Sequence, residues 1–177
     1  MDLRIKRTTE NIREAFIKLR SKKAIEKISV KELAELANIN KATFYLHYKD
    51  IYDLADTVER TLIDEIFSAI DRPDLFLDNP GKFTADLFKA YIKIQPLADV
   101  IFSGSRRHSL IDNIEIKMRG VLSEKYPELK DNVRLNILLS YEIQGAYYAY
   151  SQNKDKYDYD TLIQIISGAS EALSTLS

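Results

Sequence analysis

Residues 29–48 of the chain, SVKELAELANINKATFYLHY, have the pattern of two short helices joined by a tight turn. Ser29 is a good N-cap and Glu32, three residues later, completes a capping box, so a helix is predicted to begin near Val30. The apolar positions that follow recur at spacings of three and four, and they are Val30, Leu33, Ala34 and Ala37. The stretch therefore begins with a capped amphipathic helix of about two turns.

Two asparagines predict the turn and the second helix. Asn38 follows the last apolar position, and asparagine enters the left-handed conformation that ends a helix more readily than any residue except glycine. Asn40 can cap a second helix over residues 41–47, with Phe44 and Tyr48 four residues apart on its inner side. A short capped helix, a tight turn and a second short helix form a helix-turn-helix, whose second helix lies in the major groove of DNA.

The second predicted helix carries side chains that suit contacts with DNA. Lys41 and Thr43 lie in its first turn, the part of a recognition helix that reaches base edges, and Tyr45 and His47 can donate to phosphates. Ala42 has no bulk to keep the backbone away from the groove. The residues predicted to contact DNA are Ser29, Lys31, Asn40, Lys41, Ala42, Thr43, Tyr45, Leu46, His47 and Lys49.

This stretch resembles the DNA-binding signature of the TetR/AcrR-type bacterial transcriptional regulators. In that family a capped helix ends in Ala-Gly-Val, and a short helix that contains Thr-Leu-Tyr-x-His-Phe follows. Residues 37–39 are Ala-Asn-Ile here, and residues 43–48 are Thr-Phe-Tyr-Leu-His-Tyr. Two positions depart from the family pattern: Ala42 replaces a frequent glycine, and Ile51 replaces a lysine that contacts a phosphate in the family. Lys49 is the nearby residue that could reach the same strand.

A further helix is predicted before this stretch, over residues 8–20, with Thr8 or Thr9 as its cap. Its inward positions are Ile12, Ala15, Phe16 and Leu19, which would complete a three-helix unit. Arg4, Lys6 and Arg7 precede it as a flexible basic arm that lies along phosphates or enters the minor groove; the alternative is a solvated terminus.

Composition and charge agree with an all-helical chain whose first 50 residues bind DNA. Five Gly and four Pro in 177 residues, with few alternating β-branched runs, favour an all-α chain. Residues 1–50 carry 12 Lys and Arg against 7 Asp and Glu, whereas residues 51–177 carry 14 against 20. We therefore predict a helix-turn-helix DNA-binding domain over residues 1–50, with salt-sensitive binding helped by dimerisation.

Several classes of protein are disfavoured by what the sequence lacks. It has no run of 18 apolar residues, no signal-peptide pattern at its start and no cysteine, so we expect a cytoplasmic protein with no membrane partner and no thiolate metal site. It has two histidines, no glycine-rich phosphate loop and no metal-ligand spacing. We therefore expect no enzymatic activity, no catalytic residues, no cofactor and no metal.

Residues 51–177 are predicted to form a helical regulatory and dimerisation domain, which brings the total to about nine helices. A long helix over about residues 50–70 has a core face made of Leu54, Val58, Leu62, Ile66 and Ile70. Residues 71–80 are predicted as a loop and residues 82–94 as a helix. Pro96 then interrupts it, either as a kink or as the first turn of a separate short helix through Phe102. Further helices are predicted over residues 109–125 and 128–151, and from residue 160, where the stripe extends to Leu176.

Small residues in the last two predicted helices allow close approach of a partner. Since the family pairs through its last two helices, the resemblance implies a homodimer built as an intermolecular four-helix bundle. The predicted interface residues are Gly145, Ala149, Leu162, Ile166, Ala169 and Leu173. The alternative is that these residues pack only within one chain.

The resemblance also implies a ligand cavity between the middle helices. The candidate lining residues are Phe83, Leu87, Tyr91, Phe102, Met118 and Tyr141, with His108 and Arg107 as polar partners. For each apolar residue the alternative is ordinary core, and for His108 it is a surface histidine.

Together these features predict a ligand-responsive, sequence-specific transcriptional regulator. It would bind double-stranded DNA at a palindromic operator as a homodimer, and a small-molecule effector would release it, which makes it a repressor. The alternative is an adaptor with a helix-turn-helix-like fold that acts mainly through protein contacts. Ile51 favours the adaptor, and the set Thr43, Tyr45 and His47 favours the regulator.

Overall fold

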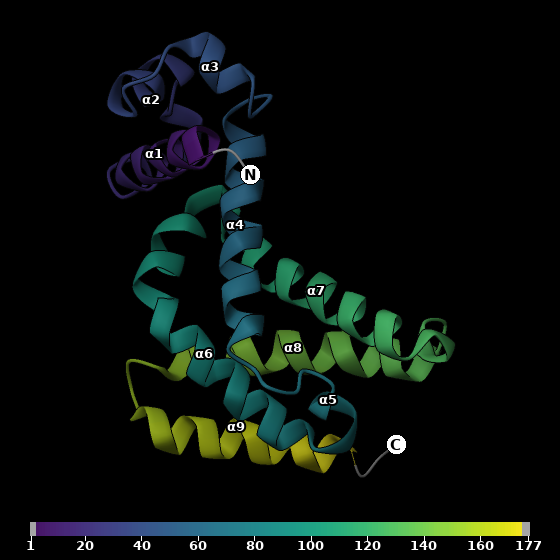
Figure 1. Cartoon of the computed structure of the whole chain (residues 1–177). Helices are drawn as coiled ribbons and strands as arrows, with labels where there is room; N and C mark the ends of the chain where they lie inside the picture. The colour runs from purple at the N-terminus through teal and green to yellow at the C-terminus, as the bar shows by residue number, and fades with distance from the viewer. Residues whose placement is uncertain (1–2, 175–177) are drawn as a thin grey trace. The chain divides into compact units, whose positions relative to one another are not determined.

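The protein is built from α-helices, as Figure 1 shows. The computed structural model describes residues 3–174, and within this range it contains nine α-helices, three short 3-10 helices and no strand. The prediction of an all-α chain is confirmed. Leu176, the last position of the predicted apolar stripe, lies outside the described residues.

The chain divides into two compact units. Unit 1 consists of the described residues up to Leu62 together with Pro96–Leu110. Unit 2 consists of Ile63–Gln95 and the described residues from Ile111 onward. The predicted division of roles at residue 50 concerns function and stays a prediction.

Helix α1 spans Leu3–Arg20, so it begins earlier than predicted. Thr8 and Thr9 are not caps, because their hydroxyls donate to carbonyls four residues earlier, at 2.9 and 3.2 Å. The predicted flexible basic arm is therefore wrong for Arg4, Lys6 and Arg7, which lie in helical turns. Leucine, arginine and lysine favour helix, and nothing before Thr8 breaks it. The inward positions Ile12, Ala15, Phe16 and Leu19 are buried, as predicted.

A 3-10 helix over Ile25–Lys27 leads to α2, which spans Val30–Leu36 and is followed by α3, Lys41–Tyr45. Ser29 caps α2, since its hydroxyl accepts from the Glu32 amide at 3.2 Å. Asn38 has a φ of 54°, which confirms the left-handed residue between the two helices. Helix α3 ends two residues before the predicted end at residue 47, and His47 continues it as a turn through a 3.0 Å hydrogen bond from its amide to the Phe44 carbonyl.

Helix α4 spans Ile51–Ser68. Asp50 caps it, because one carboxylate oxygen accepts from the Tyr52 and Asp53 amides at 2.8 and 2.9 Å. The predicted core positions within this helix, Leu54, Val58, Leu62 and Ile66, are buried; the fifth, Ile70, is also buried but follows the end of the helix at Ser68. Apolar residues repeated every four positions have thus formed the buried stripe that periodicity indicates.

The segment predicted as a loop over residues 71–80 contains the short helix α5, Leu75–Asp78. Helix α6 spans Pro80–Ile101 without a break, with Pro96 inside it. The predicted alternative of a separate short helix that begins at Pro96 is therefore wrong, although unit 1 resumes at this residue. At the start of α6, a Cβ on Gly81 would come within 2.8 Å of the Ser167 carbonyl oxygen on the last helix, so the close approach requires glycine here.

The remaining helices lie in unit 2, except for the 3-10 helix Gly104–Arg106 and the first two residues of α7, which belong to unit 1. This 3-10 helix precedes α7, which spans Ser109–Lys125 as predicted. A third 3-10 helix, Pro127–Leu129, follows, and Asn132 caps α8, Val133–Asn153, so α8 begins five residues after the predicted start at residue 128. Helix α9 spans Tyr159–Ser174 and contacts α8.

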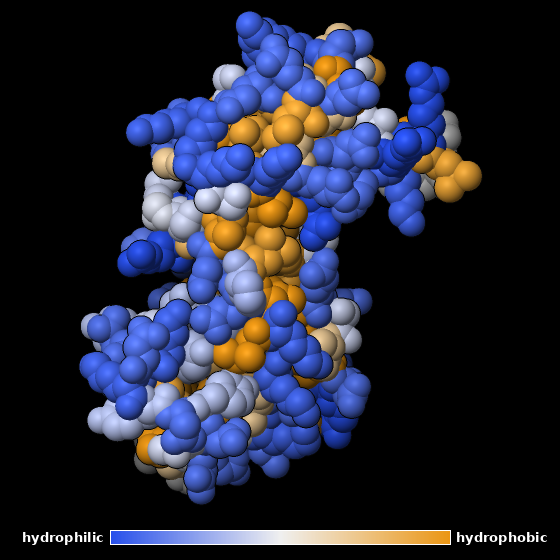
Figure 2. Space-filling view, turned by 90° about the vertical axis from the view of Figure 1, so that its left-hand side faces the viewer, coloured by the Kyte–Doolittle hydropathy of each residue, from blue (hydrophilic) through white to orange (hydrophobic). Residues whose placement is uncertain are grey.

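Apolar side chains also reach the surface. On the face that Figure 2 displays, hydrophobic residues (orange) show between hydrophilic ones. Helices α8 and α9 contribute several exposed large apolar side chains, namely Val133, Ile137, Tyr141, Tyr148 and Ile165. One side of α8 is therefore buried within the chain, and another side is exposed.

Candidate functional site

The first candidate surface is formed by α3 and the turn that precedes it. The Asn40 side-chain oxygen accepts from the Thr43 amide at 2.7 Å and from the Thr43 hydroxyl at 2.9 Å. Phe44 is fully buried and anchors the helix to unit 1, and its ring lies 5.7 Å from that of Tyr48. The cap and the buried ring fix which face of α3 is turned to solvent.

Most of the residues predicted to contact DNA, in α2 and α3, at their N-caps and just after α3, are exposed. The exposed ones are Ser29, Lys31, Asn40, Lys41, Ala42, Tyr45, Leu46 and Lys49, and the half-buried ones are Thr43 and His47. Leu46 has 82% of its surface exposed, which is more than Tyr45 has. Thr43 uses its hydroxyl proton within the cap, which leaves its lone pairs for an incoming donor.

The start of α4 differs from what the family pattern implies. Ile51 is 7% exposed, so this position belongs to the core of unit 1. The carboxylate of Asp50 already accepts from two of the first amides of α4. A phosphate approaching this helix start would meet a carboxylate in place of free amides. Lys49 is exposed beside it, and its amide donates to Asp53 at 2.9 Å.

Two arginines within unit 1 make contacts that the sequence did not predict. Arg106 donates to both carboxylate oxygens of Glu59, at 2.7 and 2.6 Å, and also pairs with Asp56. Glu59 is 0% exposed. The hydrogen bond to Glu59 raises the pKa of Arg106, which keeps this guanidinium charged. A fork-shaped pair of this kind ties residues 104–106 to α4.

Arg20 at the end of α1 makes the second connection to this segment. Its guanidinium donates to the carbonyls of Ile101 and Ser103 at 3.2 and 3.1 Å, and to the Ser103 hydroxyl at 2.7 Å. Burial lowers the pKa of Arg20. No local sequence pattern pairs Arg20 or Arg106 with partners more than 40 positions away, so neither contact could be predicted.

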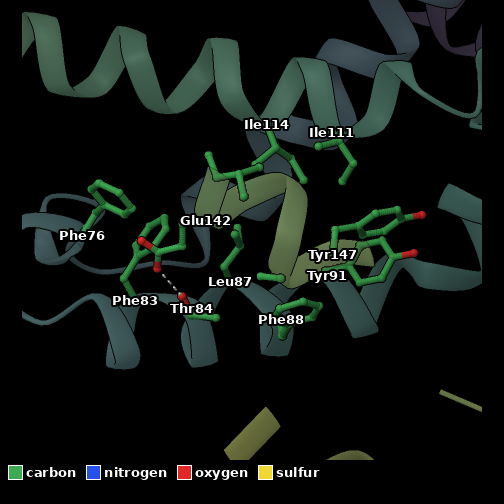
Figure 3. Close-up of a pocket in the computed structure, with 12 residues that line it drawn as sticks. Phe76, Phe83, Thr84, Leu87, Phe88, Tyr91, Ile111, Ile114, Glu142 and Tyr147 are labelled. Atoms are coloured by element: carbon green, nitrogen blue, oxygen red, sulfur yellow. Dashed lines mark hydrogen bonds between the residues drawn. The ribbon is translucent and has the colours of Figure 1, made fainter. Parts of the chain in front are cut away.

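The second candidate site is an apolar cavity within unit 2, shown in Figure 3. Helices α5, α6, α7 and α8 supply its walls: Phe76, Phe83, Thr84, Leu87, Phe88, Tyr91, Ile111, Ile114, Glu142, Ile143, Ala146 and Tyr147. Its free volume is about 30 Å³, which is room for about two waters. In the present conformation the cavity is therefore too small for most organic ligands.

Glu142 is the one ionisable acid on these walls, and it is 8% exposed. Its carboxylate accepts from the Thr84 hydroxyl at 3.2 Å, and the Thr84 hydroxyl also lies 3.0 Å from that of Ser170. Burial raises the pKa of Glu142 to about 7, although the hydroxyls of Ser170 and Thr84 oppose this shift. The carboxyl group therefore changes its charge near neutral pH.

The structure brings together three of the residues predicted to line a ligand cavity. Phe83, Leu87 and Tyr91 lie on its wall. Phe102 and His108 belong to unit 1 and are not among its lining residues, and His108 is exposed. Met118 is fully buried on α7 without lining it, and Tyr141 is exposed on a different face. Arg107, the other predicted polar partner, also belongs to unit 1 and is exposed.

Glu142 was missed, although the sequence contained a signal for it. It is a single acid inside the apolar run LNILLSYEIQGAYYAY. An acid in the middle of such a run either faces solvent or is buried with polar partners, and only the fold distinguishes the two.

The third candidate surface is a groove between α8 and α9 with a volume of about 490 Å³. Five residues predicted to form a dimer interface line it: Gly145, Ala149, Ile166, Ala169 and Leu173. Leu162 is buried and is not among the lining residues. Ile165, which was not predicted as an interface residue, lies in this groove with 66% of its surface exposed.

Within the described residues, no group of three or more His, Asp and Glu side chains could hold a metal ion. None of the helices in the same part of the chain is long and apolar enough to cross a membrane. No model of a known protein family matches the chain, and searches of curated proteins and of solved structures also find no match.

Proposed function

We propose that the protein is a DNA-binding transcriptional regulator of the TetR/AcrR type, in which α2 and α3 form a helix-turn-helix. The observation that carries this proposal is the presentation of α3. Asn40 caps this helix and Phe44 anchors it, while Lys41, Tyr45 and Lys49 are exposed on its outer side and just after it. A recognition helix needs this combination of a fixed inner face and a polar outer face.

The proposed mechanism requires two copies of the chain. A dimer that holds two recognition helices about 34 to 36 Å apart can enter successive major grooves of a palindromic operator. The groove between α8 and α9 supports self-association, because its small and apolar lining residues, Gly145, Ala149 and Ala169 among them, permit close helix approach.

Regulation would come from a small molecule that binds within unit 2. A ligand that binds one conformation better than another shifts the population of conformations, and a coupling of about 1 to 3 kcal/mol is ordinary for such systems. Helices α4 and α6 each contain residues of both units, so they are the covalent routes for this coupling. The family resemblance favours a ligand that weakens binding to the operator, so the protein would be a repressor. It would act in the cytoplasm.

An adaptor that acts through protein contacts is the second candidate function. The specific observation in its favour is the start of α4, where Ile51 is buried and Asp50 accepts from the first amides. These features remove a phosphate contact that the family pattern implies. The exposed side chains of Tyr45 and Leu46 would then serve a protein partner.

Selection of bound fragments from genomic DNA at about 100 mM salt, followed by sequencing, separates the two functions. The regulator predicts enrichment of a palindrome, and loss of binding in the double variant Lys41→Ala, Tyr45→Ala. The matched control is Lys156→Ala, Tyr157→Ala, which removes the same two residue types from an exposed turn of unit 2. If no palindrome is enriched, or if the two double variants bind DNA equally well, the regulator is refuted.

A further inference from the structure

We infer that the cavity in unit 2 binds an organic cation with an apolar body, and that Glu142 is the counter-ion of its ammonium group. The role of this ligand as an effector rests on the proposed function, whereas its binding does not. The position of the carboxyl group and the lining of the cavity together lead to this assignment.

Within residues 3–174, Glu142 has hydroxyl partners but no cationic one. Its hydrogen bonds come from Thr84 and Ser170, which are neutral. None of the salt bridges within residues 3–174 includes Glu142. A buried carboxylate without a counter-charge is costly, so the site either takes up a proton or gains from a bound cation.

The charges around Glu142 also favour a cation. Glu171 on α9 is a second acid near it, and its charge contributes to the raised pKa of Glu142. Glu142 also lines two neighbouring hollows, and among all their lining residues Arg134 is the single cation. Arg134 is exposed and lines one of these two hollows, but not the cavity itself. An anionic ligand at Glu142 would therefore meet like charge at close range.

The opposite end of the cavity offers aromatic surface. Figure 3 shows Tyr91 and Tyr147 beside each other at this end, with Leu87 between them and Glu142. The two tyrosine rings lie 6.2 Å apart at an angle of 80°. Aromatic and aliphatic walls bind an apolar chain or ring, and tyrosine faces also attract a cation. The cavity thus has one acid at one end and apolar walls along its length. This arrangement is complementary to an ammonium ion with an apolar body.

Binding requires the cavity to enlarge, and a second hollow adjoins it. This hollow has a volume of about 240 Å³ and shares Phe76 and Glu142 with the cavity as walls. The inference therefore requires displacement of Phe76, a buried side chain in the wall shared by the two spaces, whose ring lies 5.7 Å from that of Phe83. The ligand would then select a conformation with Phe76 displaced, which gives it different affinities for two states of unit 2.

The test measures binding to the full chain in the absence of DNA, by calorimetry at pH 8. The probe is 4-phenylbutylammonium, and its neutral counterpart is 4-phenylbutanol. We expect Glu142→Gln to weaken binding of the ammonium ion at least about tenfold and to leave binding of the alcohol within about twofold, because only the ion uses the charge. The control Glu124→Gln removes an exposed acid from α7 and should change neither affinity.

A second measurement does not depend on any variant. Binding of the ammonium ion to the wild-type chain should strengthen between pH 6 and pH 8, as Glu142 loses its proton, while binding of the alcohol should not. Equal affinities for the two probes, an unchanged affinity in Glu142→Gln, or no increase with pH would each overturn the inference. Operator binding is measured separately, so that a failure there refutes the regulator and leaves the cation site standing.

Discussion

Replacement of Arg106 by methionine should destabilise unit 1 strongly. The substitution keeps much of the side-chain length but leaves Glu59, which is 0% exposed, without the two hydrogen bonds of 2.6 and 2.7 Å that it accepts from Arg106. Removing one partner of a buried ion pair costs about 3 to 5 kcal/mol, since the remaining charge stays desolvated. We expect a loss of this size in the free energy of unfolding, measured by urea denaturation at pH 7.

The neighbouring residue supplies the matched control. Arg107 is exposed, so Arg107→Met should change the free energy of unfolding by less than about 0.5 kcal/mol. The double variant Glu59→Met, Arg106→Met removes both charges and should recover most of the stability that Arg106→Met loses. Equal stability of Arg106→Met and Arg107→Met, or a double variant no more stable than Arg106→Met, would refute the role given to this ion pair.

Three further predictions concern unit 2 and self-association. Gly81→Ala should lower the free energy of unfolding by about 1 to 3 kcal/mol, because its Cβ would lie 2.8 Å from a backbone oxygen. The control Gly120→Ala, whose Cβ would meet nothing within 4 Å, should be neutral or stabilising. Equal urea midpoints of the two variants would contradict this. The raised pKa of Glu142, about 7, means that the folded state holds a proton that the unfolded state releases above its ordinary pKa, so stability should fall as pH rises from about 4.5 to 7. Relative to Glu142→Gln, the wild-type chain should lose up to about 3 kcal/mol across that range, at about 1.4 kcal/mol per pKa unit, and parallel pH profiles of the two proteins would show that Glu142 does not titrate there. Ala169→Arg places a charge in the groove between α8 and α9 and should convert a dimer into a monomer in sedimentation. The control Gln164→Arg changes an exposed residue of the same helix outside the groove and should leave the dimer intact. A wild-type monomer at micromolar concentration would refute the dimer itself.

Features that depend on near neighbours in the chain could be predicted from the sequence. Ser29 caps α2 and Asn40 caps α3, because a capping side chain reaches an amide only two or three residues away. Asn38 adopts a positive φ for a reason that lies within the residue itself. The core face of α4 also follows from local spacing, since residues four apart lie on one side of any helix.

Local patterns were less reliable where they allowed two interpretations. Thr8 has the chemistry of a cap, but it lies inside α1 because the residues before it also favour helix. Among the residues predicted for a ligand cavity, Tyr91 lies on its wall while Phe102 belongs to unit 1. Both are aromatic and buried, so composition could not separate a cavity wall from ordinary core.

Only the folded chain shows which residues that are distant in the sequence contact one another. The packing of the helices brought Arg106 to Glu59, buried Ile51 in unit 1, and placed Glu142 against Thr84 within an apolar cavity. None of these contacts follows from helical spacing, because each partner's position depends on how separate helices pack. The charge of Glu142 and the pairing of Arg106 therefore arise from burial and distance, which are properties of the tertiary structure.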